Sequence, residues 1–347
     1  MSSPSADVGA PTNRSRTTFS KAWTGQKHMR VGAIDIGSNS IRLLVADLPD
    51  GRGWGPGLET VARAGEACRL GRGLHETGRI AEDLVDRAAS ITQEFARRAR
   101  SLGAVHVLVA ATAAIRSAAN GEAVALLIGG RAGLPVRILS GNEEAQLVYR
   151  AVILGLGQRA RASQCVVFDL GGGSTEVVSG VAAQPGRWSS IPFGAVSLTE
   201  RLLPGDPPDE VAVVEARSQI ASELMHGCAL MPARTTLLAG VGGTVTVLAS
   251  LDRGLTDYDP AALEGWYIER ERVMTLVRQL VHSSQQDRRK LPIMGDGRAD
   301  IIGAGALVVE ALMERFAAPG LVCSTQGLRY GVARLAAEEW RNQSAGR

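Results

Sequence analysis

Two aspartates each stand at the end of an apolar run, directly before a turn rich in glycine and serine. Asp35 begins the segment Asp-Ile-Gly-Ser-Asn-Ser, and Asp169 begins Asp-Leu-Gly-Gly-Gly-Ser-Thr. Turns of this composition present backbone N–H groups without an intervening Cβ, so they can hold an anion such as phosphate. A carboxylate beside such a turn suits a hard cation such as Mg²⁺, shared with phosphate oxygens. The pattern therefore indicates phosphate chemistry at two strand ends.

A third turn of this kind, Gly240-Val-Gly-Gly-Thr, follows another apolar run. One glycine-rich turn alone is weak evidence, because hairpin turns often contain glycine. Three such turns at strand ends, two of them preceded by aspartate, are difficult to explain as plain turns. We therefore predict that they bind phosphate.

Three glutamates lie close to these motifs. Glu176 follows the second turn and could join the two aspartates at a metal. Glu143 and Glu144 open a predicted helix, where a carboxylate stabilises the helix dipole by about 0.3–1 kcal/mol. That role is sufficient for one member of the pair and leaves the other free for chemistry.

Arg116 ends the segment Ala-Thr-Ala-Ala-Ile-Arg after a predicted strand. Its guanidinium could hold phosphate through charge-assisted hydrogen bonds worth about 1.5–3 kcal/mol. On spacing alone a surface arginine explains it equally well. The five histidines and four cysteines show no metal-type spacing, and we assign them no role.

Strands and helices must bring these residues together. Apolar runs predict two hairpins, each folded around one of the aspartate turns, and helical spacing predicts two long helices. The predicted strands cover 31–36, 41–48, 165–170 and 176–178, and the predicted helices cover 80–102 and 298–316. The repeated hairpin indicates two similar α/β domains that face each other.

We expect the ordered chain to begin near Met29, after a disordered tail at 1–28 that is rich in Ser, Thr, Pro and Arg. The predicted domains span 29–147 and 148–340, and a flexible tail covers 341–347. The 347 residues suffice for two domains, and 45% of them are hydrophobic, which provides for two cores.

Composition excludes several classes of function. The net charge of +3 is too small to indicate a nucleic-acid-binding protein. No stretch approaches the ~18 consecutive apolar residues of a membrane span, and the first residues contain no secretory hydrophobic segment. We therefore expect a cytoplasmic protein without a nucleic-acid or membrane partner.

In their order along the chain, these motifs resemble those of the exopolyphosphatase and guanosine-pentaphosphatase family. The resemblance covers roughly Met29 to Ala337 and rests on the segments 35–45, 111–116, 140–145, 169–176, 240–244, 297–303 and 324–331. It implies two actin-like (ribonuclease H-like) α/β domains with mixed sheets, and an active site in the cleft between them.

The resemblance also implies roles for individual residues. Glu144 would be the base that activates water, Glu176 an essential carboxylate near the metal, and Arg116 a phosphate ligand. Asp35 and Asp169, with Glu176, would position Mg²⁺ or Mn²⁺. The residues implied to cradle phosphate are Gly37, Ser38, Asn39, Gly171, Gly172, Gly173, Ser174, Thr175, Gly242, Gly243 and Thr244.

The implied reaction is in-line attack by water on the terminal phosphoryl group of polyphosphate. Longer members of the family continue into a helical region with a His-Asp motif, which this chain lacks, so it resembles the short two-domain form. We therefore expect a preference for short chains. Arg63, Arg69 and Arg72 lie in a loop punctuated by glycines, within which Arg69-Leu-Gly-Arg-Gly-Leu resembles a family motif lining the cleft, and we predict that these arginines hold the polymer. The basic cluster 288–290 is interpreted as a solvated helix face.

Three alternatives stay open at this point. The first is hydrolysis of guanosine pentaphosphate, which presents the same terminal phosphoanhydride. The second is a sugar or acetate kinase of the same fold, and the third is an actin-like filament or nucleotide-binding protein. We also expect the domains to close over substrate, and a homodimer is consistent with general frequency alone.

Overall fold

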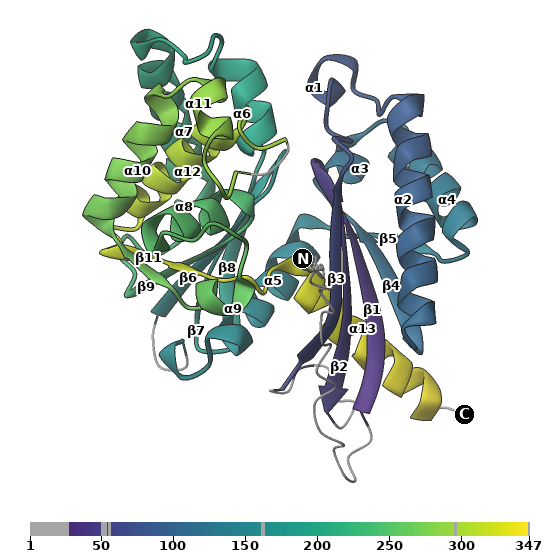
Figure 1. Ribbon diagram of the computed structural model, residues 1–347. Coiled ribbons are helices and arrows are strands. Elements are labelled where there is room, and N and C mark those ends of the chain that lie inside the picture. Colours follow the sequence, from purple (N-terminus) through teal and green to yellow (C-terminus); the bar gives the residue numbers. More distant parts are fainter. Residues whose placement is uncertain (1–27, 50–53, 55–56, 161–163, 295–296, 346–347) are drawn as a thin grey trace, which may run out of the picture.

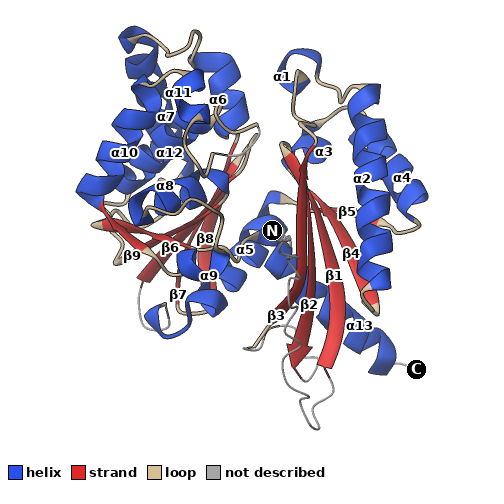
Figure 2. Cartoon of the chain, in the orientation of Figure 1, coloured by secondary structure: helices blue, strands red, loops and turns tan. Residues whose placement is uncertain are grey.

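The computed structural model describes residues 28–49, 54, 57–160, 164–294 and 297–345, whose strands form two sheets (Figures 1 and 2). The first sheet has the strand order β3-β2-β1-β4-β5, and the second has the order β10-β11-β9-β6-β7-β8. Each sheet contains a three-stranded antiparallel meander at one edge, β1-β2-β3 in the first sheet and β6-β7-β8 in the second. The first strand of each meander pairs in parallel with a further strand of the sheet, β4 or β9. The predicted mixed α/β architecture is therefore confirmed.

The first part of the chain builds the first sheet and the helices on its outer face. Its strands are β1 (His28–Ile36), β2 (Ser40–Pro49), β3 (Glu59–Ala67), β4 (His106–Ala111) and β5 (Val136–Ile138). Its helices are α1 (Leu74–Thr77), α2 (Glu82–Ser101), α3 (Ala113–Ser117) and α4 (Gly121–Ala132). The predicted strands and the helix predicted at 80–102 coincide with β1, β2 and α2 to within three residues at either end.

The remainder builds the second sheet. Its strands are β6 (Gln164–Leu170), β7 (Thr175–Val181), β8 (Gln184–Ile191), β9 (Leu237–Val241), β10 (Tyr267–Glu269) and β11 (Gly320–Cys323). Its helices are α5 (Gly141–Leu156), α6 (Ala195–Leu202), α7 (Glu210–Gly227), α8 (Gly243–Arg253), α9 (Pro260–Leu263), α10 (Arg270–His282), α11 (Gln285–Arg289), α12 (Ile302–Arg315) and α13 (Leu328–Ala345), and the 3-10 turn η1 covers Gly157–Arg159.

The chain passes between the two sheets twice. Helix α5 follows the last strand of the first sheet and packs against β6, β7 and β8 of the second. Helix α13 follows β11 of the second sheet and packs against β1, β2 and β4 of the first, as well as against α5. The two helices lie side by side between the sheets (Figure 1).

The domain limits predicted from the sequence stay a prediction. The limit at 147/148 falls within α5, and residues 341–345 of the predicted C-terminal tail form the end of α13. The predicted N-terminal tail and residues 346–347 lie outside the described residues, apart from the first residue of β1.

Alternation along the central strands assigns each face to a different core. On β1, Ile34 and Ile36 pack with α2 and α4, whereas Val31 and Ala33 pack in a core that α5 and α13 share. Each fully buried side chain of this size contributes about 1.5–3 kcal/mol. A slip of one residue would turn every side chain to the other face, so these cores fix the register.

The second sheet divides its faces in the same way. On β6, Phe168 and Leu170 pack in a core built from α7, α8, α10 and α12. Cys165 and Val167 belong instead to the core around α5 and α13 that the first sheet also uses. The inner faces of the two sheets therefore point at one another across the same pair of helices. Within the described ranges, no helix has the length and apolar character needed to cross a bilayer.

Candidate active site

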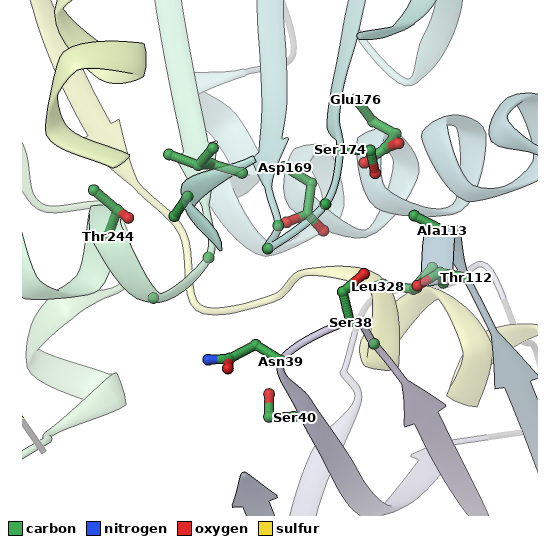
Figure 3. Close-up of a pocket in the computed structure, with 18 of the residues that line it drawn as sticks. Ser38, Asn39, Ser40, Thr112, Ala113, Asp169, Ser174, Glu176, Thr244 and Leu328 are labelled. Atoms are coloured by element: carbon green, nitrogen blue, oxygen red, sulfur yellow. The ribbon is translucent and has the colours of Figure 1, made fainter. Parts of the chain in front are cut away.

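Strand alternation brings the two predicted aspartates into one pocket. Asp35 shares its face of β1 with Val31 and Ala33, and Asp169 shares its face of β6 with Cys165 and Val167. Both carboxylates therefore lie on the inner faces, where each strand leaves the shared core. They line one pocket between the sheets, called here the site pocket (Figure 3).

The site pocket collects most of the residues predicted from the sequence. Figure 3 shows Asp169, Ser174 and Glu176 on one side and Ser38, Asn39 and Ser40 on the other. The predicted residues that line it are Asp35, Gly37, Ser38, Asn39, Glu144, Asp169, Gly171, Gly172, Gly173, Ser174, Glu176, Gly242, Gly243 and Thr244.

The two hairpin turns have matching backbones and lie against each other. The Gly37 N–H donates to the Ser40 carbonyl at 3.1 Å, and the Gly171 N–H donates to the Ser174 carbonyl at 3.0 Å. A Cβ added to Gly173 would lie 3.0 Å from the Ser38 Oγ, closer than side chains normally approach. Glycine at this position therefore favours the close approach of the two turns, because a larger side chain would have to displace the Ser38 hydroxyl.

The third turn is the N-terminus of α8. Gly242 has φ +111°, which side-chain-bearing residues rarely adopt, and a Cβ there would lie 2.5 Å from the Leu170 carbonyl oxygen. Only glycine fits this position, so the chain can enter α8 directly beside the second hairpin. The first N–H groups of a helix have no partner within it, and Gly242, Gly243 and Thr244 at the start of α8 line the site pocket, which favours a bound anion there.

Of the two predicted glutamates at the start of α5, one caps the helix and the other lies in the pocket. Ser140 and Glu143 form a reciprocal capping box, and Glu143 also pairs with Arg137. The Glu144 side chain is only 5% exposed and lines the site pocket. The sequence signal that separates them is Ser-x-x-Glu, the capping-box pattern, which identifies Glu143.

Arg116 connects Glu144 to the second sheet. Its Nη1 donates to the Glu144 Oε2 at 2.7 Å and to the Leu139 carbonyl at 2.9 Å. Its Nη2 lies 3.9 Å from the Glu176 Oε1. The guanidinium, half-buried at the end of α3, therefore orients Glu144 and sits between both glutamates. It does not line the site pocket in this structure.

Glu176 is held by hydroxyl groups on the second sheet. It lies opposite Asp169 on β6 and opposite Ser190 on β8. The Ser190 Oγ donates to the Glu176 Oε1 at 2.8 Å, and a further hydrogen bond comes from Ser174. With 2% exposure the carboxylate has one fixed position. Thr175, in contrast, is buried and donates to the Phe193 carbonyl at 2.8 Å, away from the pocket.

Burial raises the pKa of every carboxylate in the site, and repulsion adds to it for Asp169 and Glu144. Burial, followed by repulsion from Glu176, raises the pKa of Asp169 to about 7. The same two causes raise the pKa of Glu144 well above its usual range, although Arg116 opposes them. Burial also raises the pKa of Asp35, against the nearby charges of Arg42 and Arg329. The protein therefore concentrates negative charge that a bound cation would neutralise.

The donor set suits a metal that shares its ligands with substrate. Among the described residues, no three His, Cys, Asp or Glu side chains are placed to hold a metal ion together, so no complete protein cage exists. Mg²⁺ is normally held by one or two carboxylates plus phosphate oxygens and water. Asp35 and Asp169, on facing strand ends, provide that number of carboxylates. The assignment of Asp35, Asp169 and Glu176 as ligands stays a prediction.

A second cavity, of about 580 Å³, opens from the site pocket and is lined by four arginines. We call it the arginine cavity; its arginines are Arg42, Arg63, Arg298 and Arg329. Burial and the charge of Arg42 lower the pKa of Arg298 and of Arg329, so cations are crowded here. Among the described residues, its acidic side chains are Asp35 and Asp169, at the end shared with the site pocket, and the exposed Glu66 and Asp257.

Sequence reasoning identified Arg63 of this group as a polymer residue and missed the other three. Arg42 follows the first turn, and Arg298 and Arg329 fall within the later motifs 297–303 and 324–331, which is the signal that could have identified them. The other two predicted polymer residues lie elsewhere. Arg69 pairs with Asp300 at 3.2 Å and Arg72 with Asp83 at 3.5 Å, and neither lines the site pocket or the arginine cavity.

Comparison with known proteins agrees with this geometry. The sequence profile of the Ppx/GppA phosphatase family matches residues 44–337. Exopolyphosphatase 2 of Mycobacterium tuberculosis is 35% identical over 316 residues, which cover 88% of this chain and 97% of the relative. Among solved structures, the Aquifex aeolicus family member has a TM-score of 0.77 at 30% identity, covering 91% of this chain and 99% of its own. The structure of an exopolyphosphatase from Cytophaga hutchinsonii has a TM-score of 0.80 at 25% identity, and the match covers 90% of this chain and 98% of that one.

Proposed function

The chain belongs to the Ppx/GppA phosphatase family and has its two actin-like α/β domains, and on that premise we propose that it is an exopolyphosphatase. It removes the terminal phosphoryl group of inorganic polyphosphate by hydrolysis. The observation that carries the proposal is that the site pocket and the arginine cavity, which differ in their chemistry, are joined. Buried carboxylates and phosphate-type turns surround the site pocket, and an arginine-lined cavity opens directly from it.

The arginine cavity provides for the polymer. Guanidinium groups bind phosphate oxygens through two parallel hydrogen bonds, and four of them line a space of about 580 Å³. Burial and then the charge of Arg42 lower the pKa of Arg298 and Arg329, and bound polyphosphate would offset both causes by pairing with the guanidinium groups. The limited volume also supports the proposed preference for short chains.

The site pocket provides for the reaction. The turns at 37–39, 171–174 and 242–244 present backbone N–H groups and hydroxyls to the terminal phosphoryl group. Glu144, oriented by Arg116, accepts a proton from the attacking water. A divalent cation, which Asp35 and Asp169 would hold, supplies neutralisation of the phosphate charge. Positioning and charge neutralisation account for most of the rate, as in other phosphoryl transfers.

The test compares two adjacent glutamates. Glu144→Gln removes the base, so orthophosphate release from polyphosphate should fall by about 10²–10⁴-fold. Glu143→Gln is the matched control, because Gln preserves the capping box and the side chain lies outside the pocket. Equal activity of Glu144→Gln and wild type would remove Glu144 from the mechanism. No phosphate release by folded wild-type protein would overturn the proposed function.

Guanosine pentaphosphate is a second candidate substrate. The observation that favours it is Tyr258, an exposed aromatic side chain on the rim of the arginine cavity, where a base could stack on its ring. Replacing it by leucine should then lower kcat/KM for guanosine pentaphosphate by about 5–100-fold and leave polyphosphate hydrolysis within twofold of wild type. Equal effects on both substrates would count against a base site.

We also propose that the protein acts in the cytoplasm, where both substrates occur as soluble anions, and that it uses Mg²⁺ or Mn²⁺. A homodimer is proposed on general frequency alone. Sedimentation equilibrium at micromolar concentration measures the mass directly, and a monomer there would remove the dimer from the proposal.

A further inference from the structure

A third cavity, of about 450 Å³, adjoins the site pocket. We call it the side cavity. It shares Ser38, Ala113, Gly172, Gly173 and Ser174 with the site pocket, and it shares no lining residue with the arginine cavity. Among the described lining residues, the arginine cavity and the side cavity therefore each adjoin the site pocket and not each other, and residues of the two hairpin turns lie between the site pocket and the side cavity.

We infer that the side cavity is a separate channel through which water enters and orthophosphate leaves, while the shortened polymer stays in the arginine cavity. The inference deepens the proposed function and rests on it. Its basis is the requirement of in-line displacement, in which the nucleophile and the leaving group lie on opposite sides of phosphorus.

The two ends of the site are not equivalent in charge. The arginine cavity has four arginines against the exposed Glu66 and Asp257, and its other two acidic residues, Asp35 and Asp169, are the ones that a bound cation would neutralise, so the polyanion lies there. The side cavity has Arg116, Arg201 and His75, but Arg116 is already paired with Glu144, and Glu200 also lines the wall. A product must be bound weakly to leave, and this wall offers little net positive charge.

The groups that would act on water lie at the side-cavity end. Arg116, Ser174 and Ser190 all line the side cavity. The first holds Glu144 at 2.7 Å, and the two serines hydrogen-bond Glu176. A cavity of this volume holds several waters, each of which takes about 30 Å³ in the liquid. Glu144 and Glu176 themselves line the site pocket, so water would reach the proposed base from the side cavity through the junction between the two spaces.

The bonds and protons of the proposed hydrolysis balance, and the orthophosphate product forms on the side from which water enters. The water oxygen forms a bond to the terminal phosphorus, and the bond from that phosphorus to the bridging oxygen breaks. One water proton passes to Glu144, and the bridging oxygen becomes the new end of the polymer. Inversion moves the released phosphate toward the side from which water came, so orthophosphate emerges facing the side cavity.

The junction between the two spaces is formed by both sheets. Ser38 and Ala113 come from the first, and residues 172–174 come from the second. Gly173 adds no side chain to the junction, and a Cβ at this position would lie 3.0 Å from the Ser38 Oγ. The junction is therefore narrow when the two turns are in contact, and separation of the sheets widens it.

The experiment blocks each of the two cavities with the same side chain. Ser117 is exposed, lines the side cavity and donates only to the backbone of its own helix, so Ser117→Trp fills the channel without cutting into the core. Thr256→Trp is the matched control, because Thr256 is also exposed and lines the arginine cavity. Total orthophosphate after acid quench and free orthophosphate, read by a fluorescent phosphate-binding protein, are followed together with polyphosphate as substrate.

With Ser117→Trp, quenched phosphate should rise ahead of free phosphate by about one molecule per site, because product is formed and trapped. Thr256→Trp should raise KM and show no such lag. A lag confined to Thr256→Trp, or no lag in a folded and active Ser117→Trp, would overturn the inference. Failure of the proposed function is distinguishable, since wild-type protein would then release no phosphate at all.

A second variant keeps the test independent of the bulky substitution. Arg201 is exposed on α6 at the edge of the side cavity, and Arg201→Glu makes that edge acidic. Inhibition by added orthophosphate should weaken roughly threefold or more, while KM for polyphosphate stays within twofold. In wild type, orthophosphate should inhibit noncompetitively with polyphosphate, because the two occupy different ends. Competitive inhibition, unchanged by Arg201→Glu, would place both in the same channel.

Discussion

The hairpins β1-β2 and β6-β7 have the same backbone and opposite electrostatics. Each has an aspartate two residues before a turn glycine, and each aspartate faces the other sheet. Across the hairpin from Asp35 stands Arg42, whereas Asp169 has Glu176 in the equivalent place. Directly opposite side chains on a sheet interact strongly, so this one difference decides the charge of each half of the site.

The comparison teaches how one supersecondary unit serves two purposes. In the first hairpin the cross-strand arginine offsets the aspartate and extends into the arginine cavity, where it can bind a polyanion. In the second, burial and then repulsion from Glu176 raise the pKa of Asp169 to about 7. The first hairpin is built for holding substrate, and the second for the charge that chemistry and a cation require.

The largest expected effect lies in the second hairpin. Glu176→Gln should lower kcat for phosphate release by on the order of 10²–10³-fold, because the fixed buried charge is lost. Ser190→Ala removes only one hydrogen bond to that carboxylate, so its effect should stay within about tenfold. Similar losses in both variants would mean that position, and not charge, is what Glu176 contributes.

A substitution in the first hairpin should weaken the binding of polyphosphate more than it slows the reaction. Arg42→Gln should raise KM for polyphosphate by about 10–100-fold, the loss of one charge-assisted contact, with a smaller change in kcat. The salt dependence of KM should also become shallower, because fewer counterions are released. Arg97→Gln, a surface arginine paired with Glu94, is the control. A change in kcat with constant KM would contradict the division between the hairpins.

The contributions of the two hairpins to metal binding can be compared without measuring catalysis. Saturating Mg²⁺ should stabilise the wild-type protein by about 1–3 kcal/mol against thermal unfolding, since it binds the folded state. Asp169→Asn should abolish most of that gain, and Asp35→Asn should remove a smaller part because Arg42 already offsets Asp35. Calorimetry with and without EDTA measures this; equal stabilisation in all three proteins would exclude both aspartates as ligands.

The smallest expected effect is on the stability of the metal-free protein. Glu176→Gln removes a like charge buried beside Asp169 and Glu144, so the free energy of unfolding at neutral pH should increase by about 1–2 kcal/mol. Glu66→Gln, an exposed control, should change it by less than about 0.5 kcal/mol. Urea unfolding in EDTA gives both values. Destabilisation by Glu176→Gln would show that its hydrogen bonds outweigh the repulsion.

Much of the site could be predicted because its residues follow local rules. Asp35 and Asp169 end strands and precede turns, and the alternation of their neighbours shows which face they share. Ser140, three residues before Glu143, identifies the capping glutamate and so leaves Glu144 for the pocket. The resemblance to the family, which the comparisons confirm, supplied the order of motifs.

The arginine cavity could not be predicted in this way. Arg42 lies on β2, Arg298 precedes α12 and Arg329 lies in the first turn of α13, and no periodicity connects them. They meet because α13 returns to the first sheet, which is a property of the tertiary fold. Arg69 and Arg72 show the converse, since their sequence context is suggestive while their partners in the structure are Asp300 and Asp83.

The two passages of the chain, through α5 and through α13, have a mechanical consequence. A body joined to another at a single point can swivel and twist freely, but two joints leave rotation about the line through them. We expect a hinge rotation of one sheet relative to the other about an axis near α5 and α13, which pack together. The displacement should be largest where Ser38 contacts Gly173 and smallest near the two helices. Each closure would then return the same turn atoms to the same alignment, without a search for register.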